Sequence, residues 1–124
     1  MLRTLVSHLK DGGLVIEVPS SDDVLLTFYE IDAFKRFTFW SQHLFLFNAE
    51  TLRRLAVQAR LRVISIQQFQ RYPLSYHLHW LSRSKPDGHQ HWSLLDIPAF
   101  SEAYAASMAA MGRCDTIIAH LENE

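Results

Sequence analysis

The sequence predicts a single α/β domain with about three strands and flanking helices. Two observations carry this prediction. Three short runs of apolar and β-branched residues, at 13–19, 62–70 and 115–121, have the length and composition of strands. Between the first two lies a segment, 49–59, whose apolar residues recur at helical spacing. The 124 residues, 48% of them hydrophobic and 20% charged, can bury one modest core, so residues 1–124 are expected to form one domain.

The composition excludes several classes of function. A formal net charge of -1 gives no electrostatic footprint for nucleic acid or for an anionic membrane. The single cysteine, Cys114, excludes an internal disulfide. No signal peptide is expected at the start of the chain, and no apolar stretch approaches the ~20 residues that span a bilayer. A soluble, cytoplasmic protein is therefore expected.

The first element is predicted to be a helix at 2–10, ended by a left-handed residue at Gly12 or Gly13. Its apolar face has the i, i+3, i+4, i+7 spacing and consists of Leu2, Leu5, Val6 and Leu9. The strand at 13–19 follows. Because this strand is apolar until Glu17, it is expected to be covered on both sides.

The segment 19–40 is predicted to be a long loop with short helices. Asp22 and Asp23 are suited to cap one of these helices. The loop follows the carboxyl end of a strand, which is where open α/β sheets place their ligands. Its aromatic residues are typical of a lid, or of a loop that only caps the core: Phe28, Tyr29, Phe34, Phe37, Phe39 and Trp40.

The helix at 49–59 has the clearest local signals. Asn48 is a good N-cap, and Glu50 lies in the first turn, where a negative charge is favourable. Arg53 and Arg54 are expected on the solvated face. The opposite, apolar face consists of Leu52, Leu55, Ala56 and Ala59.

Two more helices are expected in the second half of the chain. Pro73 can occupy the first turn of a helix whose apolar face consists of Leu74, Leu78 and Leu81. A turn at 85–88 separates it from a last helix, which Asp96 is expected to cap and Gly112 to end. The apolar stripe of that helix is Phe100, Tyr104, Met108 and Met111.

Two segments carry a resemblance to a known family. They are Leu9-Lys10-Asp11-Gly12-Gly13-Leu14-Val15-Ile16-Glu17-Val18-Pro19 and His43-Leu44-Phe45-Leu46-Phe47-Asn48-Ala49-Glu50-Thr51-Leu52-Arg53-Arg54-Leu55. Together they resemble the carboxyl-terminal half of class I S-adenosylmethionine-dependent methyltransferases. In that family a Leu-Lys-Pro-Gly-Gly turn precedes one strand, and a His-x-x-x-(Phe/Tyr)-(Ser/Asn)-x-x-(Thr)-Leu segment opens the helix that follows. The resemblance is good as far as the second strand and looser beyond it.

The resemblance implies a Rossmann-like sheet in which the last strand, 115–121, inserts antiparallel between the strands at 13–19 and 62–70. It also implies S-adenosylmethionine as the cofactor of the intact enzyme and a small molecule as the methyl acceptor. The family binds its cofactor with a glycine-rich loop and with an acidic residue on an earlier strand. Because this sequence contains no Gly-x-Gly-x-Gly, the N-terminal, cofactor-binding half is expected to be absent and this chain to be inactive alone.

The sequence departs from the family's pattern in three places. Asp11 replaces the usual proline, Ser20 stands where an asparagine is common, and Ala59-Arg60-Leu61 replaces Ala-Gly-Phe. If the backbone at Arg60 still adopts the left-handed conformation, the side chain costs roughly 1 kcal/mol. The chain is then either an excised half-domain or a truncated reading frame with little remaining activity.

Methyl transfer requires positioning and, where the acceptor atom carries a proton, a base. His43 is the first candidate base, because it precedes the capped helix in a segment that would face the pocket. The alternative is a histidine that only packs on the loop. Glu17 is the second candidate, with an ion pair to a nearby cation as its alternative. Tyr29, Phe39 and Trp40 are the candidate acceptor contacts, although core packing is the stronger expectation for at least two of them.

Two His-x-His pairs raise the possibility of a metal site, because imidazole suits several transition metals. They are His77 with His79, and His89 with His91. On a helix, residues two apart point about 200° apart, so the first pair cannot share a metal. The second pair is expected in a loop, where no carboxylate or thiolate joins it, and no native metal site is expected. Cys114 has no evident base beside it and is expected to be inert.

Two other hypotheses remain open. The chain could be a noncatalytic interaction module that pairs with itself or another chain through the strand at 13–19. Without its usual neighbour this strand would expose an unpaired apolar edge, so a homodimer, or pairing with the missing half, is expected in either case. A small metal enzyme that uses His89 and His91 is the third hypothesis.

Overall fold

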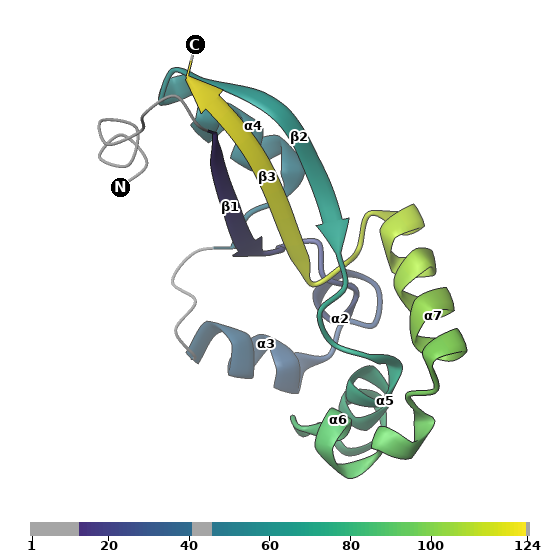
Figure 1. Cartoon of the computed structure of the whole chain (residues 1–124). Coiled ribbons are helices and arrows are strands. Elements are labelled where there is room, and N and C mark those ends of the chain that lie inside the picture. The colour runs from purple at the N-terminus through teal and green to yellow at the C-terminus, as the bar shows by residue number, and fades with distance from the viewer. Residues whose placement is uncertain (1–12, 41–45, 124) are drawn as a thin grey trace.

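A computed structural model describes residues 13–40 and 46–123. Its sheet has three strands, β1 (Leu14–Pro19), β2 (Leu61–Phe69) and β3 (Thr116–Asn123). The strand order is β1-β3-β2, and β3 runs antiparallel to both neighbours. Figure 1 shows β3 between the other two. The α/β class and the antiparallel insertion of the last strand are therefore confirmed.

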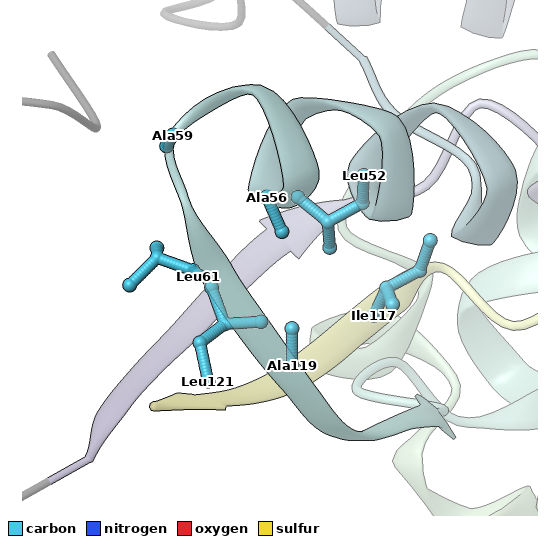
Figure 2. Close-up of a cluster of buried hydrophobic side chains, with 7 residues drawn as sticks. All are labelled: Leu52, Ala56, Ala59, Leu61, Ile117, Ala119 and Leu121. Atoms are coloured by element: carbon cyan, nitrogen blue, oxygen red, sulfur yellow. The ribbon is translucent and has the colours of Figure 1, made fainter. Parts of the chain in front are cut away.

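Helix α4 (Ala49–Gln58) covers one face of the sheet, and a capping box fixes where the helix begins. The Asn48 side chain accepts a hydrogen bond from the Thr51 amide at 2.8 Å, and the Thr51 hydroxyl accepts one from the Asn48 amide at 3.0 Å. This reciprocal capping box satisfies two amides of the first turn. The predicted apolar stripe then packs on the sheet in a core of Leu52, Ala56, Ala59, Leu61, Ile117, Ala119 and Leu121 (Figure 2).

Strand β1 differs from the expectation in having one exposed face. Leu14, Ile16 and Val18 pack against the core under α4. Val15, on the other face, is 61% exposed, and Glu17 is also exposed. The prediction of a strand covered on both sides is wrong for the described residues. Successive side chains of a strand point to opposite faces, and an apolar residue such as Val15 can occupy the exposed face.

The predictions before β1 fall mostly outside the described residues. The helix at 2–10 and Gly12 lie there. Gly13 is described and does not adopt a left-handed conformation. Its backbone instead lies close to β3. A Cβ atom at Gly13 would lie only 3.0 Å from the carbonyl oxygen of Leu121, so glycine suits this position.

The remaining helices gather beyond the carboxyl ends of β1 and β2 (Figure 1). They are α2 (Val24–Thr27), α3 (Asp32–Trp40), α5 (Leu74–Arg83), α6 (Gly88–His91), the 3-10 helix η1 (Ser93–Leu95) and α7 (Pro98–Met111). They enclose a second core of Val24, Leu25, Phe34, Tyr76, Trp80, Met108 and Cys114. No helix among the described residues is both long enough and apolar enough to cross a membrane.

The faces of α5 and α7 correct two predictions. The buried residues of α5 are not its leucines: Leu81 is exposed, and Tyr76 and Trp80 are buried together with Ser75, His77 and His79. On α7, Met108 is buried, but Phe100 and Met111 are exposed. Gly112 ends α7 in the left-handed conformation, with φ 67°, as predicted.

Asp96 does not cap α7, and this prediction is wrong. The N-cap of α7 is Ile97, which makes no side-chain hydrogen bond. The Asp96 carboxylate instead accepts hydrogen bonds from the Ser75 amide at 3.2 Å and from the Ser75 hydroxyl at 2.6 Å. Asp96 therefore caps the first turn of α5, and it joins the chain before α7 to Ser75, 21 residues earlier.

Candidate functional site

A cavity of about 570 Å³ lies where the carboxyl ends of β1 and β2 meet the start of β3 and helix α3. We call it the Asp23 cavity. Its walls consist of Glu17, Val18, Pro19, Asp23, Phe34, Phe37, Thr38, Arg71, Tyr72, Tyr76, Asp115 and Thr116. Because β1 and β2 run in the same direction, their carboxyl ends open at one edge of the sheet. This edge is the place that the sequence predicts for a ligand.

Asp23 is a strongly perturbed carboxyl group in the cavity wall. It is the N-cap of α2, and its Oδ1 accepts a hydrogen bond from the Leu25 amide at 2.9 Å. Its side chain is buried, and this burial raises the pKa of Asp23 to about 7, with the nearby charge of Asp115 acting in the same direction. A carboxyl group that is about half ionised at neutral pH can both accept and donate a proton.

Asp115 has a different role, because its carboxylate is occupied by hydrogen bonds. Oδ1 accepts from the Arg71 amide at 2.8 Å and from the Thr116 hydroxyl at 2.9 Å. Oδ2 accepts from the Gln70 side-chain amide and from the Tyr72 amide, both at 2.9 Å. Burial raises the pKa of Asp115 above its usual value, and the hydrogen bonds from Arg71, Tyr72 and Thr116 offset only part of this effect. Asp115 thus holds the chain that leaves β2 against the start of β3.

Aromatic rings form two walls of the cavity. From α3 come Phe34 and Phe37, which lie three residues apart on one helical face. Tyr72 and Tyr76 form the second wall, and their stacked rings have centroids 4.1 Å apart. Burial raises the pKa of Tyr76 to about 12, so its hydroxyl remains protonated at neutral pH.

Glu17 and Arg71 form an ion pair at the rim of the cavity. Both side chains are about half exposed, so the pair contributes at most about 1 kcal/mol to stability. The alternative reading of Glu17, an acid paired with a nearby cation, is thus what the structure contains. The ion pair also neutralises the arginine that faces the cavity.

Of the other predicted site residues, those whose side chains the structure describes do not line this cavity. His43 lies outside the described residues, as does the side chain of Trp40. Phe39 is 60% exposed and does not line the cavity. Tyr29 packs beside the second core, where its hydroxyl lies 3.1 Å from that of Tyr104. The predicted roles of Tyr29 and Phe39 as acceptor contacts gain no support from the Asp23 cavity.

Several residues of the cavity wall are not among the predicted site residues, and the sequence patterns that could indicate them differ in strength. Phe34 and Phe37 are among the aromatic residues of the predicted lid but not among the candidate acceptor contacts. With Thr38 they have the i, i+3, i+4 spacing of one helix face, which the prediction of a long loop does not use. Asp23 was correctly predicted as a cap, but no local pattern indicates that a cap is also buried beside a second carboxylate. Asp115 was only the first residue of a predicted strand.

A buried chain of polar groups leads from the second core toward Asp115. Nδ1 of His77 lies 2.5 Å from the Tyr104 hydroxyl, and Nε2 lies 3.3 Å from the Gln70 side-chain amide. Gln70 in turn donates to Asp115. Burial lowers the pKa of His77 to about 4, so the imidazole is neutral at pH 7. The neutral ring shares a hydrogen bond with the Tyr104 hydroxyl through Nδ1. Nε2 has only the longer contact with Gln70, because the two amide hydrogens of Gln70 already point to Asp115 and to the Tyr72 carbonyl oxygen.

The two histidines of each His-x-His pair contact different groups. Nδ1 of His79 lies 2.8 Å from the Lys85 carbonyl oxygen, and its ring stacks on that of His91 with centroids 5.6 Å apart. His89 lies instead against Tyr72 and Tyr76. Both His89 and His91 belong to helix α6, so the predicted loop is wrong. Within 13–40 and 46–123, no three metal-ligating side chains come together.

Cys114 is buried in the second core, and its amide donates to the Gln68 side-chain oxygen at 3.1 Å. Burial raises the pKa of its thiol to about 11, and the charges of Asp115 and Asp23 add to this effect. The thiolate is therefore scarce at neutral pH, in agreement with the expected inertness.

The described residues do not by themselves fit S-adenosylmethionine. No glycine among them lines the Asp23 cavity, and the first turn of α2, which begins there, is already capped by Asp23. The cavity thus lacks the open, glycine-lined backbone on which such a cofactor rests. A comparison of the chain with known protein families and with curated protein sequences finds no match.

Proposed function

We propose that this chain is the acceptor-binding, carboxyl-terminal portion of a methyltransferase that uses S-adenosylmethionine. The observation that carries the proposal is the sheet order β1-β3-β2, with an antiparallel last strand in the middle and a cavity at the carboxyl ends of its two neighbours. The family that the sequence resembles ends its sheet in this way. Class I methyltransferases act on many acceptors, so the fold alone selects none of them.

The contents of the cavity support an acceptor site. Methyl transfer is an in-line displacement, and the protein contributes mainly by positioning the acceptor and, where needed, removing a proton from it. Asp23 is buried and close to half ionised at pH 7, which suits the second task. Helix α3 supplies an aromatic wall for the first task.

The cofactor is held, on this proposal, by residues other than those described here. The chain alone then binds neither S-adenosylmethionine nor its demethylated product, and it is inactive alone. A polypeptide that joins the chain to a glycine-rich cofactor-binding half restores both binding and methyl transfer.

Calorimetric titration of S-adenosylmethionine tests this proposal. It is done on the chain alone and on the polypeptide that extends through any coding sequence upstream of Met1. Stoichiometric binding by the longer polypeptide only, with methyl transfer that Asp23→Asn slows, supports the proposal. Stoichiometric binding by the chain alone, or binding by neither polypeptide, contradicts it.

The position of β1 favours a second candidate function, a noncatalytic module that associates through this strand. β1 is an edge strand: β3 covers one side of it, and on the other side the described residues meet it only where Phe47 pairs with Ser20. Val15 exposes an apolar side chain on the same strand. An open, apolar edge favours pairing with another strand.

The mass of the chain in solution tests the second candidate. Light scattering after size exclusion is measured on wild type and on Val15→Lys, which places a charge on the exposed face of β1 without touching the core. A wild-type dimer that the substitution converts to a monomer supports association through β1. A wild-type protein that stays monomeric at high concentration rules it out.

A further inference from the structure

We infer that the Asp23 cavity binds a small organic amine as its ammonium ion, with Asp23 as the counter-ion and the aromatic rings of α3 and α5 as the walls. Binding follows from the cavity alone. That the amine is the methyl acceptor rests on the proposed function.

The charges around the cavity favour a cation. Three carboxyl groups, Glu17, Asp23 and Asp115, face one guanidinium, that of Arg71. Arg71 is paired with Glu17, and the Asp115 carboxylate accepts four hydrogen bonds. The negative charge that remains to be compensated, among the described wall residues, is that of Asp23. An anionic ligand would meet this charge without a cation to balance it.

The aromatic walls favour an organic cation over an inorganic one. The face of an aromatic ring attracts an ammonium group, and the attraction increases when the site excludes water. Phe34, Tyr72 and Tyr76 are at least partly buried, and Tyr76 lies close enough to Asp23 for the carboxylate charge to help raise the pKa of the tyrosine. A divalent metal needs several oxygen ligands, but the Asp115 oxygens already accept hydrogen bonds. The volume of about 570 Å³ fits a molecule the size of an arylalkylamine.

Methylation of the bound amine requires that the ammonium first transfers a proton to Asp23. An ammonium nitrogen has no lone pair and cannot accept a methyl group. One of its protons passes to the Asp23 carboxylate, which becomes a neutral carboxyl group, and the amine is left neutral with a free lone pair. The titratable groups that interact with Asp23 include Asp115, Tyr76, Tyr104 and Cys114, and the Leu25 amide donates a hydrogen bond to its carboxylate. The negative charge of the Asp115 carboxylate raises the pKa of Asp23 and so favours transfer of the proton to it.

The test compares a matched pair of probes, 2-phenylethylammonium and 2-phenylethanol, by calorimetric titration into the chain. The two probes have similar shapes, and they differ in charge. Wild type is expected to bind the ammonium about tenfold more tightly than the alcohol. At pH 7 the ammonium should release about half a proton per binding event, measured in buffers of different ionisation enthalpy, because binding favours the ionised form of Asp23.

Asp23→Asn is the informative variant, because asparagine caps a helix as well as aspartate does and carries no charge. It is expected to lower the affinity for the ammonium about tenfold, to leave the alcohol unaffected and to abolish proton release. Asp22→Asn, at the neighbouring position outside the cavity wall, is the control and should behave as wild type. Phe37→Leu, at a partly exposed site, should weaken the ammonium severalfold more than the alcohol.

Equal affinities of wild type for the two probes, or binding of neither at millimolar concentration, overturn the inference. An Asp23→Asn variant that retains the preference for the ammonium does the same. The outcome for the amine site is independent of the proposed function. A preference for the ammonium, together with no methyl transfer by the longer polypeptide, would support the amine site and contradict the methyltransferase proposal.

Discussion

Oδ2 of Asp115 accepts a hydrogen bond from the Tyr72 amide at 2.9 Å, and this contact joins the start of β3 to the chain that has just left β2. The same carboxylate accepts from Arg71 and Gln70. Residues 70–72 therefore lie where they do because one buried carboxylate binds three of their donors. Tyr72 and Arg71 reach the wall of the Asp23 cavity through this arrangement.

The first prediction concerns this carboxylate. Asp115→Asn replaces one acceptor oxygen by an amide that cannot accept, so at least one buried donor loses its partner. The free energy of unfolding is expected to fall by about 2–4 kcal/mol, measured by urea denaturation followed by circular dichroism. Thr116→Val removes only a donor to the same carboxylate and is expected to cost less. Equal losses for the two variants would contradict the central role of Asp115.

The second prediction concerns Asp23 and pH. Its pKa is about 7 in the folded protein and lies near 3.8 when unfolded, so the folded state holds the proton more tightly. Its contribution to stability is present below about pH 4 and is lost as the pH rises to about 7. The difference in unfolding free energy between wild type and Asp23→Asn should therefore fall with increasing pH by up to roughly 1.4 kcal/mol per unit and level off above 7. If the difference in unfolding free energy between the two proteins did not depend on pH, the pKa of Asp23 would be the same in the folded and unfolded states, which contradicts the prediction.

The third prediction concerns His77, whose effect has the opposite sign. Its pKa is about 4 when folded, below its usual value of 6.5, so the unfolded state binds the proton more tightly. The stability of wild type relative to His77→Gln should be constant above about pH 6.5 and should decrease as the pH falls toward 4. Between pH 4 and 6.5 this trend opposes that of Asp23. Urea denaturation of both variants across this range separates the two effects, and parallel trends would contradict the assignment.

The fourth prediction concerns Arg60, which joins α4 to β2 with φ 59°. A glycine at this position relieves the crowding of the Cβ atom in the left-handed conformation. Arg60→Gly is expected to raise the free energy of unfolding by up to about 1 kcal/mol, although the greater freedom of glycine in the unfolded chain offsets part of the gain. Arg60→Ala keeps the Cβ atom and serves as the control. A stabilisation of similar size in both variants would assign the effect to the arginine side chain.

The sequence predicts those parts of the fold that short-range signals control. Asn48 and Gly112 mark helix ends through hydrogen bonds and backbone conformations that involve only near neighbours. The position of β3 in the sheet is a long-range property, and its correct prediction came from the resemblance to a family. No periodicity in this chain specifies that the last strand lies between the other two.

Two features that the sequence does not predict, the role of Asp96 and the raised pKa of Asp23, depend on partners far along the chain. Asp96 has the residue type and position of a cap for α7, but Ser75 competes for its carboxylate. Asp23 is a cap as predicted, and its raised pKa depends on burial under elements far along the chain. Neither the burial of a group nor its distant partner can be read from the residues beside it in the sequence.

The measurement that tests the account most directly is the titration of the Asp23 carboxyl carbon by ¹³C NMR, with and without 2-phenylethylammonium. Asp23→Asn identifies the resonance. The account predicts a midpoint of about 7 for the chain alone. It also predicts a midpoint lower by about one unit when the ammonium is saturating, since a bound cation favours the carboxylate. A midpoint near 4, or one that the ammonium does not move, would contradict the assignment of the Asp23 cavity as an amine-binding site.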